Sequence, residues 1–394
     1  MTSYPDLIQA ALPEDAGAAA LAGRVWRPDA GGPAVVAVRD DQVIDISARF
    51  PTMRDLCEAS DPADALRAAD GQALGPLAAL LANTARETRD RSRPWLLAPI
   101  DLQAIKAAGV TFAISMLERV IEERARGDAA SAATIRAEVT RLVGDDLGKL
   151  KPGSAEAMHL KQVLMSQNAW SQYLEVGIGP DAEIFTKAQP MAAVGTGMDG
   201  GIHPNSSWNN PEPEVVLAVA STGRIVAATL GNDINLRDVE GRSALLLGKA
   251  KDNNASCAIG PLLRFLDDRF TLDDIRSTTV TLRVDGSDGF VLEGSSSIAR
   301  ISRDPADLVA QMVNAHHRYP DGAVLFLGTM FAPIQDRDAP GQGFTHKTGD
   351  IVSIAAPRLG CLVNRMMPTD RCEPWLFGVS ALMRNLAARG LLRG

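Results

Sequence analysis

Two kinds of hydrophobic periodicity divide the chain. Apolar residues recur at helical spacing over residues 114–126 and 131–143, which predicts two helices, and Pro152-Gly153-Ser154 predicts the start of a third, to about residue 167. From Glu183 onward, short apolar runs end at Gly, Asn and Asp residues, which is typical of strands and turns. The second half of the chain is therefore predicted to be rich in β-structure.

The predicted strands pair as hairpins, and single helices interrupt them. The hairpins cover residues 211–233 and 279–297, and two late strands cover "AVLFLGTM" and "GDIVSIAAP". A helix is expected from Pro305 to about His316, because Pro is well placed at a first helical position, and a terminal helix over 377–389. The fold class expected from this order is α+β.

Two domains are expected from the length of 394 residues. Residues 1–100 are predicted to form a small α+β domain, with two short strands around the Asp40–Asp41 turn. The Pro-rich segment "RSRPWLLAPIDL" predicts the boundary. Residues 101–394 form the expected catalytic domain, with a helical insertion over 128–168 that serves as a lid or an oligomer contact.

Composition narrows the classes of function. The net charge is −8, which disfavours nucleic-acid binding, since nucleic acids reward basic patches. We expect no export signal and no membrane span, because no basic apolar leader and no run of about 18 apolar residues occurs. The four cysteines are scattered and form no C-x-x-C pair, so a cytoplasmic protein is expected.

The segment "WNNPEPEVVLAV" places two acids ahead of an apolar strand. Glu212 and Glu214 are two residues apart and project to the same face. If the hairpin turns at Thr222–Gly223, Glu212 lies opposite Asp233, although a register slip of one residue would place Asn232 there. The pair either faces solvent or, with Asp233, binds a divalent cation. An all-carboxylate site suits Mg²⁺, Mn²⁺ or Ca²⁺.

Three segments together resemble the fumarylacetoacetate hydrolase family. These are "PEPEVVLAV", "GNDINLRD" and "GKAKDNNASCAIGP", followed by "LGTM" and "GDIVSI". The family carries E-x-E on one strand, N-D-x-x-x-R-D after the return strand, and a lysine nine residues before Gly-Pro, where this chain has Lys251. The resemblance covers roughly residues 105–365 and implies the β-rich roll or barrel of that family.

The resemblance also implies the roles of several residues. Glu212, Glu214 and Asp233 would bind Mg²⁺ or Mn²⁺, which would chelate a 2-oxo acid and stabilise an enolate. Lys251 would act as acid or base or bind a substrate oxygen; the alternative is a solvated loop lysine. Thr329 would bind the substrate carboxylate or be an ordinary strand-end threonine. Arg237 would bind substrate or form a supporting ion pair with Asp238.

The chain departs from the family at one position. Hydrolases of this family carry N-Y-x-x-H-x-x-E, and the matching stretch "VTFAISMLER" places Ser115 at the histidine position and Glu118 at the acid. A serine hydroxyl does not accept a proton at neutral pH as imidazole does, so hydrolysis would need another histidine, of which His346 is the first candidate. A dehydratase needs no activated water. Lys251, Glu118 and Glu122 are candidates for its acid, base and substrate-binding groups.

The serine pattern resembles the dehydratase branch of the family. This resemblance implies a hydro-lyase that converts the small 2-oxo-3-deoxy sugar acid 2-keto-3-deoxy-D-xylonate (2-dehydro-3-deoxy-D-arabinonate) to 2,5-dioxopentanoate in oxidative pentose breakdown. It also implies a homodimer or homotetramer. Two alternatives remain, a metal-dependent acylpyruvate or diketo-acid hydrolase and a non-catalytic metal-binding scaffold.

Overall fold

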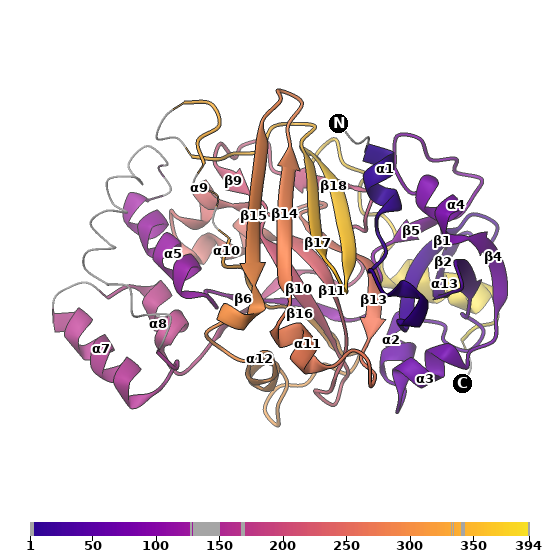
Figure 1. Ribbon diagram of the computed structural model, residues 1–394, viewed down its shortest axis with the longest axis horizontal. Helices are drawn as coiled ribbons and strands as arrows, with labels where there is room; N and C mark the ends of the chain where they lie inside the picture. Colours follow the sequence, from indigo (N-terminus) through magenta and orange to yellow (C-terminus); the bar gives the residue numbers. More distant parts are fainter. Residues whose placement is uncertain are drawn as a thin grey trace.

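The computed structural model describes residues 4–126, 128, 150–166, 170–331, 333, 335–339 and 343–392. A long mixed sheet of eleven strands runs across these residues in the order β4-β3-β2-β1-β13-β11-β10-β16-β6-β7, and β5 pairs with β1 (Figure 1). Its strands are β1 (Leu21–Arg27), β2 (Gly32–Arg39), β3 (Gln42–Asp45), β4 (Gln72–Pro76), β5 (Trp95–Leu97), β6 (Ala104–Gly109), β7 (Glu183–Ala188), β10 (Pro213–Val219), β11 (Ile225–Asp233), β13 (Cys257–Phe265) and β16 (Ala323–Phe326).

A second sheet of five strands packs on the middle of the first, in the order β15-β14-β17-β18-β8. Its strands are β8 (Asp199–Ile202), β14 (Thr279–Asp285), β15 (Val291–Ser297), β17 (Ile351–Ala356) and β18 (Gly360–Pro368). The two-residue strands β9 (Asn209–Asn210) and β12 (Asn235–Leu236) form a separate pair near the acidic residues.

Burial of both faces of strand β10 explains why its sequence is continuously apolar. Val215, Leu217 and Val219 face the core between the two sheets, whereas Val216 and Ala218 face a second core beneath α2 and α3. A strand buried on both faces needs apolar residues at every position. Glu212 and Glu214 share the parity of Val216 and Ala218, so they extend the second of these faces.

Helices cover the ends of the sheets. In Figure 1, α5, α7 and α8 lie together at one end, and α1, α2, α3, α4 and α13 lie at the other. The helices are α1 (Tyr4–Gln9), α2 (Met53–Cys57), α3 (Pro62–Arg67), α4 (Leu77–Ala82), α5 (Ala113–Ala125), α7 (Ala155–Ser166), α8 (Gln172–Ile178), α9 (Arg237–Glu240), α10 (Leu247–Lys251), α11 (Leu272–Arg276), α12 (Pro305–Met312) and α13 (Val379–Ala388). None of the described helices is long and apolar enough to cross a membrane.

Most of the predicted elements are present. The helices expected over 114–126 and 154–167 are α5 and α7, and the two hairpins are β10–β11 and β14–β15. The helix expected over 131–143 lies outside the described residues, as does most of the insertion 128–168. The helix α12 ends at Met312 rather than near His316, because Val313 has extended backbone angles.

The hairpin register agrees with the sequence-based prediction where it matters for the acids. Glu214 lies opposite Gly231, and the Asp233 N–H donates to the Glu212 carbonyl oxygen at 3.1 Å. The predicted pairing is wrong only near the turn, where an irregularity after Ala218 shifts the register by one residue. The domain boundary near residue 100 stays a prediction, since β1 hydrogen-bonds both to β5 and to β13.

Candidate active site

Three buried carboxylates meet at the open end of the β10–β11 hairpin. Glu212 and Glu214 are 4% and 3% exposed, and Asp233 at the end of β11 is 2% exposed. One oxygen from each carboxylate lies within 4.8 Å of the others. The antiparallel register creates this group, because it sets Asp233 across from Glu212. The structure thus brings together the three predicted metal ligands.

Lysines hold two of these carboxylates. Lys251, the last residue of α10, lies with Nζ 2.5 Å from Glu212 Oε2 and 3.0 Å from Asp233 Oδ2. Lys187 on β7 lies with Nζ 2.8 Å from Asp233 Oδ1. Burial opposes ionisation of Asp233, but Lys187 and Lys251 outweigh it and lower the pKa of this carboxyl. Lys251 is therefore a buried site residue, not a solvated loop lysine.

The pKa of Lys251 is set by the carboxylates that surround it. Burial favours the neutral amine, but Asp233, Glu212 and Glu240 outweigh burial and raise the pKa of Lys251. The ammonium is thus the favoured form when the carboxylates carry their charge. A cation bound by the same carboxylates would act in the opposite direction.

Glu214 is the least compensated of the three acids. Its Oε2 accepts a hydrogen bond from the Gly328 N–H at 2.7 Å, just after β16. Burial, followed by repulsion from Asp233 and Glu212, raises the pKa of Glu214 well above its usual value. A carboxylate in this position is stabilised by an added cation.

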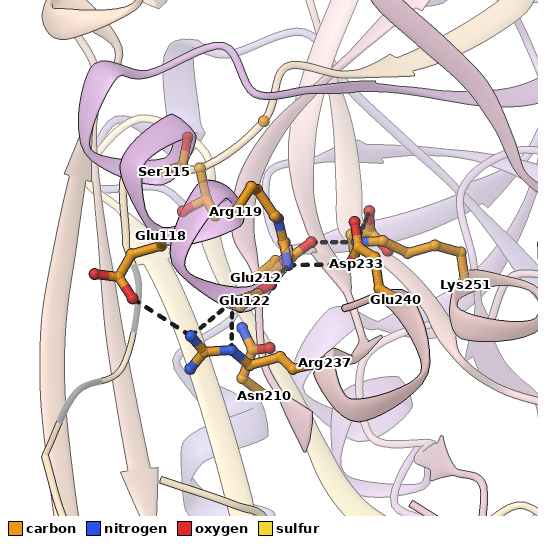
Figure 2. Close-up of polar contacts among 12 residues, drawn as sticks. Ser115, Glu118, Arg119, Glu122, Asn210, Glu212, Asp233, Arg237, Glu240 and Lys251 are labelled. Atoms are coloured by element: carbon orange, nitrogen blue, oxygen red, sulfur yellow. Dashed lines mark hydrogen bonds and ion pairs between the residues drawn. The ribbon is translucent and has the colours of Figure 1, made fainter. Parts of the chain in front are cut away.

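The helix α5 supplies a second set of charged side chains (Figure 2). Arg119 contacts Glu212 and lies 2.6 Å from Glu122 and 3.0 Å from Glu240. Arg237, the first residue of α9, donates to Glu122 at 2.6 Å and lies 3.5 Å from Glu118. These ion pairs hold the α5 carboxylates against the site.

Two of these acids were predicted as reacting or substrate-binding groups. Burial opposes ionisation of Glu122, but Arg119 and Arg237 outweigh it and lower its pKa, which favours a fixed anion over a proton carrier. The expected ion pair between Arg237 and Asp238 is wrong. Asp238 instead accepts hydrogen bonds from the Ser206 hydroxyl at 2.8 Å and the Ser207 N–H at 2.9 Å.

Two adjoining cavities open onto these residues. The first is lined by the three carboxylates together with Lys251, Glu183 and Glu240, among others. The second is lined by residues that include Glu118, Glu122, Asn210 and Arg237. Both cavities share the side chains of Ser115, Arg119, Glu212 and Thr329.

Ser115 and Thr329 lie where the two cavities meet. The Ser115 hydroxyl donates to the Phe112 carbonyl oxygen at 2.9 Å, within the first turn of α5. Thr329 is 7% exposed, and its Oγ1 accepts from the Phe331 N–H at 3.1 Å. Both hydroxyls keep further hydrogen-bonding capacity for a bound molecule.

Glu183 is an additional acid in the first cavity. It begins β7 opposite Gly109, and no hydrogen bond or ion pair among the described residues holds its carboxylate. Burial, then the negative charge of Glu240, raises the pKa of Glu183 to about 7. A carboxyl with this pKa can exchange protons at neutral pH.

The charges around the two cavities fit a divalent cation. Seven carboxylates face four cationic side chains in the described part of the site, which would leave a surplus of three negative charges with every carboxyl group ionised. The acids are Glu118, Glu122, Glu183, Glu212, Glu214, Glu240 and Asp233, and the cations are Arg119, Arg237, Lys187 and Lys251. The donors closest together are all oxygen atoms, which suits Mg²⁺ or Mn²⁺.

Histidine does not line either cavity in the part of the chain that the structure describes. His346, the first candidate for a substitute base, is 8% exposed, and its Nδ1 lies 3.2 Å from Asp350 Oδ2. Burial is the main cause that lowers its pKa. It therefore serves as a packed, hydrogen-bonded residue beside Phe344.

Sequence reasoning missed four charged residues of the site. Arg119 follows Ser115 by four positions, a spacing that places both on one helical face. Glu183, Phe185 and Lys187 are spaced two residues apart along β7, so the period of a strand could have predicted that Glu183 and Lys187 share one face. No sequence pattern indicated Glu240, because it is the last residue of the four-residue helix α9 and such a short helix shows no periodicity.

Comparison with known proteins agrees with this geometry. Residues 217–367 match the model of the fumarylacetoacetate (FAA) hydrolase C-terminal family. A 2-dehydro-3-deoxy-D-arabinonate dehydratase of Saccharolobus solfataricus is 30% identical over 184 residues, which is 46% of this chain and 57% of that protein. A probable 2-keto-3-deoxyxylonate dehydratase of Haloferax volcanii is 29% identical over 192 residues, covering 49% and 62%. Each match covers less than two thirds of the relative's length.

Solved structures share the fold. A 2-keto-3-deoxy-D-arabinonate dehydratase in its apo form superposes with a TM-score of 0.62 at 20% identity, covering 88% of this chain and 99% of that chain. A structure described as the same dehydratase complexed with magnesium and 2,5-dioxopentanoate gives a TM-score of 0.60 at 20% identity, with the same coverage. The predicted α+β fold class is confirmed, and the chain is similar to the fumarylacetoacetate hydrolase family over residues 217–367.

Proposed function

We propose that this chain is a Mg²⁺- or Mn²⁺-dependent hydro-lyase that dehydrates a 2-keto-3-deoxy-pentonate to 2,5-dioxopentanoate. The observation that carries the proposal is the buried group of Glu212, Glu214 and Asp233 with Lys251 in contact, in a cavity without histidine among its described lining residues. The names of the two curated relatives and the magnesium-complexed structure support the same substrate class.

The residues divide the chemistry of dehydration between them. A divalent cation held by the three carboxylates would polarise the 2-oxo acid and so acidify its C3 hydrogen. Glu183 would remove the C3 proton, since its carboxyl lies free in the first cavity and its pKa of about 7 suits a base at neutral pH. The Lys251 ammonium would donate a proton to the departing C4 hydroxyl, which leaves as water and gives 5-hydroxy-2-oxopent-3-enoate. Loss of a proton from C5 and addition of one at C3 would then move the double bond to C4–C5, and this enol would become the aldehyde of 2,5-dioxopentanoate.

Other residues would bind and orient the substrate. The Thr329 and Ser115 hydroxyls lie at the meeting point of the cavities and would donate to carboxylate or hydroxyl oxygens. Arg237 would act through its ion pairs with Glu122 and Glu118, which fix α5 against the site. Water activation is not required by this reaction, which agrees with a serine where a hydrolase of the family carries histidine.

A coupled assay tests the proposal. Purified protein, Mg²⁺ and 2-keto-3-deoxy-D-xylonate are mixed, and NADH is followed through an added 2-oxoglutarate semialdehyde dehydrogenase. We expect a signal that EDTA and Glu214→Gln both abolish. A metal-dependent cleavage of acylpyruvate without dehydration would instead assign a hydrolase, and no turnover of either substrate with tight metal binding would assign a scaffold.

We further propose the wider setting that the resemblance implies. The chain would act in the cytoplasm, in oxidative D-xylose or pentose breakdown, as a homodimer or homotetramer. It would carry an N-terminal domain over residues 1–100 and a catalytic domain over 101–394. Light scattering on the eluting protein measures the oligomeric state, and limited proteolysis followed by mass spectrometry locates the boundary.

A further inference from the structure

The second cavity holds an acceptor that the proposed reaction has not used. Asn210 ends β9 two residues before Glu212 and is 3% exposed. Its Nδ2 donates to the Pro211 carbonyl oxygen at 2.9 Å, but its Oδ1 has no hydrogen-bond partner among the described residues. Because buried acceptors without a donor are unfavourable and uncommon, this oxygen indicates a place for a donor from a bound molecule.

The side chains around Asn210 indicate which chemical group would donate a hydrogen bond to its Oδ1. The neighbouring Arg237 offers only donors, and the carboxylates of Glu122 and Glu118 are held by its guanidinium (Figure 2). Asn210 Oδ1 is therefore a buried acceptor in this cavity that has no hydrogen-bond partner among the described residues. A hydroxyl group suits a position between Asn210 and Arg237, because it can donate a hydrogen bond to Asn210 Oδ1 and accept one from the Arg237 guanidinium.

The second cavity adjoins the metal-binding acids. Ser115, Arg119, Glu212 and Thr329 line both cavities, so a molecule whose 2-oxo acid lies at the carboxylates can extend into the second cavity. Ser115 is small and bonds back to its own helix, so its own side chain does not fill the space where the two cavities meet.

We infer that the second cavity is the subsite for the hydroxylated tail of the substrate and that Asn210 determines specificity by accepting a hydrogen bond from the C5 hydroxyl. This inference rests on the proposed function, because it takes the bound molecule to be a 2-oxo acid. It goes further in assigning the tail hydroxyl to a named acceptor. A 2-oxo acid with an apolar tail would leave Oδ1 buried and unpaired, and would bind less tightly.

The neighbouring residue Asn209 provides a matched control. It is 2% exposed, but its Nδ2 lies 3.3 Å from Ser206 Oγ and its Oδ1 accepts from the His346 N–H at 3.1 Å. It lines neither cavity. Truncation of Asn209 should therefore disturb packing without changing recognition of the tail.

The experiment compares two ligands that cannot react. 5-Hydroxy-2-oxopentanoate and 2-oxopentanoate both lack the C4 hydroxyl and differ only in the tail hydroxyl. Their dissociation constants are measured by titration calorimetry with saturating Mg²⁺ for the wild-type protein, Asn210→Ala and Asn209→Ala. We expect the wild type and Asn209→Ala to favour the hydroxylated ligand about tenfold, and Asn210→Ala to bind both equally. Asn210→Leu replaces Asn210→Ala if the alanine variant does not fold.

Each other outcome contradicts the inference. Equal binding of the two ligands by the wild type removes the tail subsite but leaves the proposed function intact. A preference that survives in Asn210→Ala assigns the hydroxyl to another residue. If neither ligand binds to the wild type with Mg²⁺, the proposed 2-oxo acid substrate is wrong, and the tail subsite is wrong with it.

Discussion

Replacing Lys251 by methionine should raise the affinity of the protein for Mg²⁺ while removing its activity. Lys251 Nζ lies 2.5 Å from Glu212 and 3.0 Å from Asp233, and Mg²⁺ binds carboxylate oxygens at about 2.1 Å, so the two cations would lie within about 5 Å. Charges of +2 and +1 at about 5 Å repel by about 2 kcal/mol in water and about 7 kcal/mol at an effective dielectric constant of about 20. Even the lower value corresponds to more than about tenfold in affinity.

The same substitution should weaken the metal-free protein. Without the ammonium, Glu212 and Asp233 lose a buried partner, which typically costs about 3–5 kcal/mol. Titration calorimetry with Mg²⁺ measures the affinity, and thermal unfolding with and without Mg²⁺ measures the stability. Lys249→Met is the control, because Lys249 lies two residues away on α10 and is exposed. Turnover should fall by at least about 100-fold in Lys251→Met alone.

Weaker Mg²⁺ binding by Lys251→Met would refute this reasoning. It would mean that the ammonium orients the carboxylates for the metal more than it competes with the metal. Equal loss of activity in the Lys249 variant would show that the effect comes from damage to α10 and not from the charge beside the acids.

Three further substitutions test other parts of the site. Because a base works only when deprotonated, kcat/KM should fall about tenfold per pH unit below the pKa of Glu183, which bound Mg²⁺ would shift below its metal-free value of about 7. Glu183→Gln should remove this limb and slow turnover about 10²–10⁴-fold; a limb that persists assigns the base elsewhere. Gly328 has φ +84°, and a Cβ added there would lie 2.1 Å from the Thr111 hydroxyl, so Gly328→Ala should lower the free energy of unfolding, measured with urea, by about 2–4 kcal/mol. The control Gly248→Ala, whose Cβ would have no atom within 4 Å, should leave this free energy unchanged or raise it slightly. Arg237→Met leaves Glu122 with one partner fewer and should lower the free energy of unfolding by about 3–5 kcal/mol; an unchanged value would mean that this ion pair contributes little.

Sequence patterns predicted the group of three acids because all three residues belong to one hairpin. The hairpin spans 22 residues from Glu212 to Asp233, and strand alternation together with the turn sets the register. The prediction failed at the turn, where the irregularity beyond Ala218 depends on packing and not on the alternation of residue types. The three carboxylates of the proposed metal site could therefore be placed together without knowledge of the tertiary fold.

The partners of these acids could not be identified in this way. Arg119 reaches Glu212 across 93 residues of sequence, and Lys187 reaches Asp233 from a strand that is not its neighbour in the sheet. Such contacts depend on how α5 and β7 pack against the hairpin, which no single periodicity encodes. For the same reason Glu118, the acid of the motif, was expected as a reacting group, whereas it is paired with Arg237.

The hydrogen bonding between β1 and β13 has a consequence for any attempt to divide this protein. Strand β13 lies between β1 and β11, and Arg264 on β13 also holds Asp15 at 2.7 Å. A chain shortened at residue 100 would remove the partners of Leu263 and Arg264 and leave that end of β13 unpaired, beside the strand that ends in Asp233. Open edges invite pairing between molecules. The N-terminal segment thus covers part of an otherwise open strand edge, and exchanging it between relatives would require matching that edge.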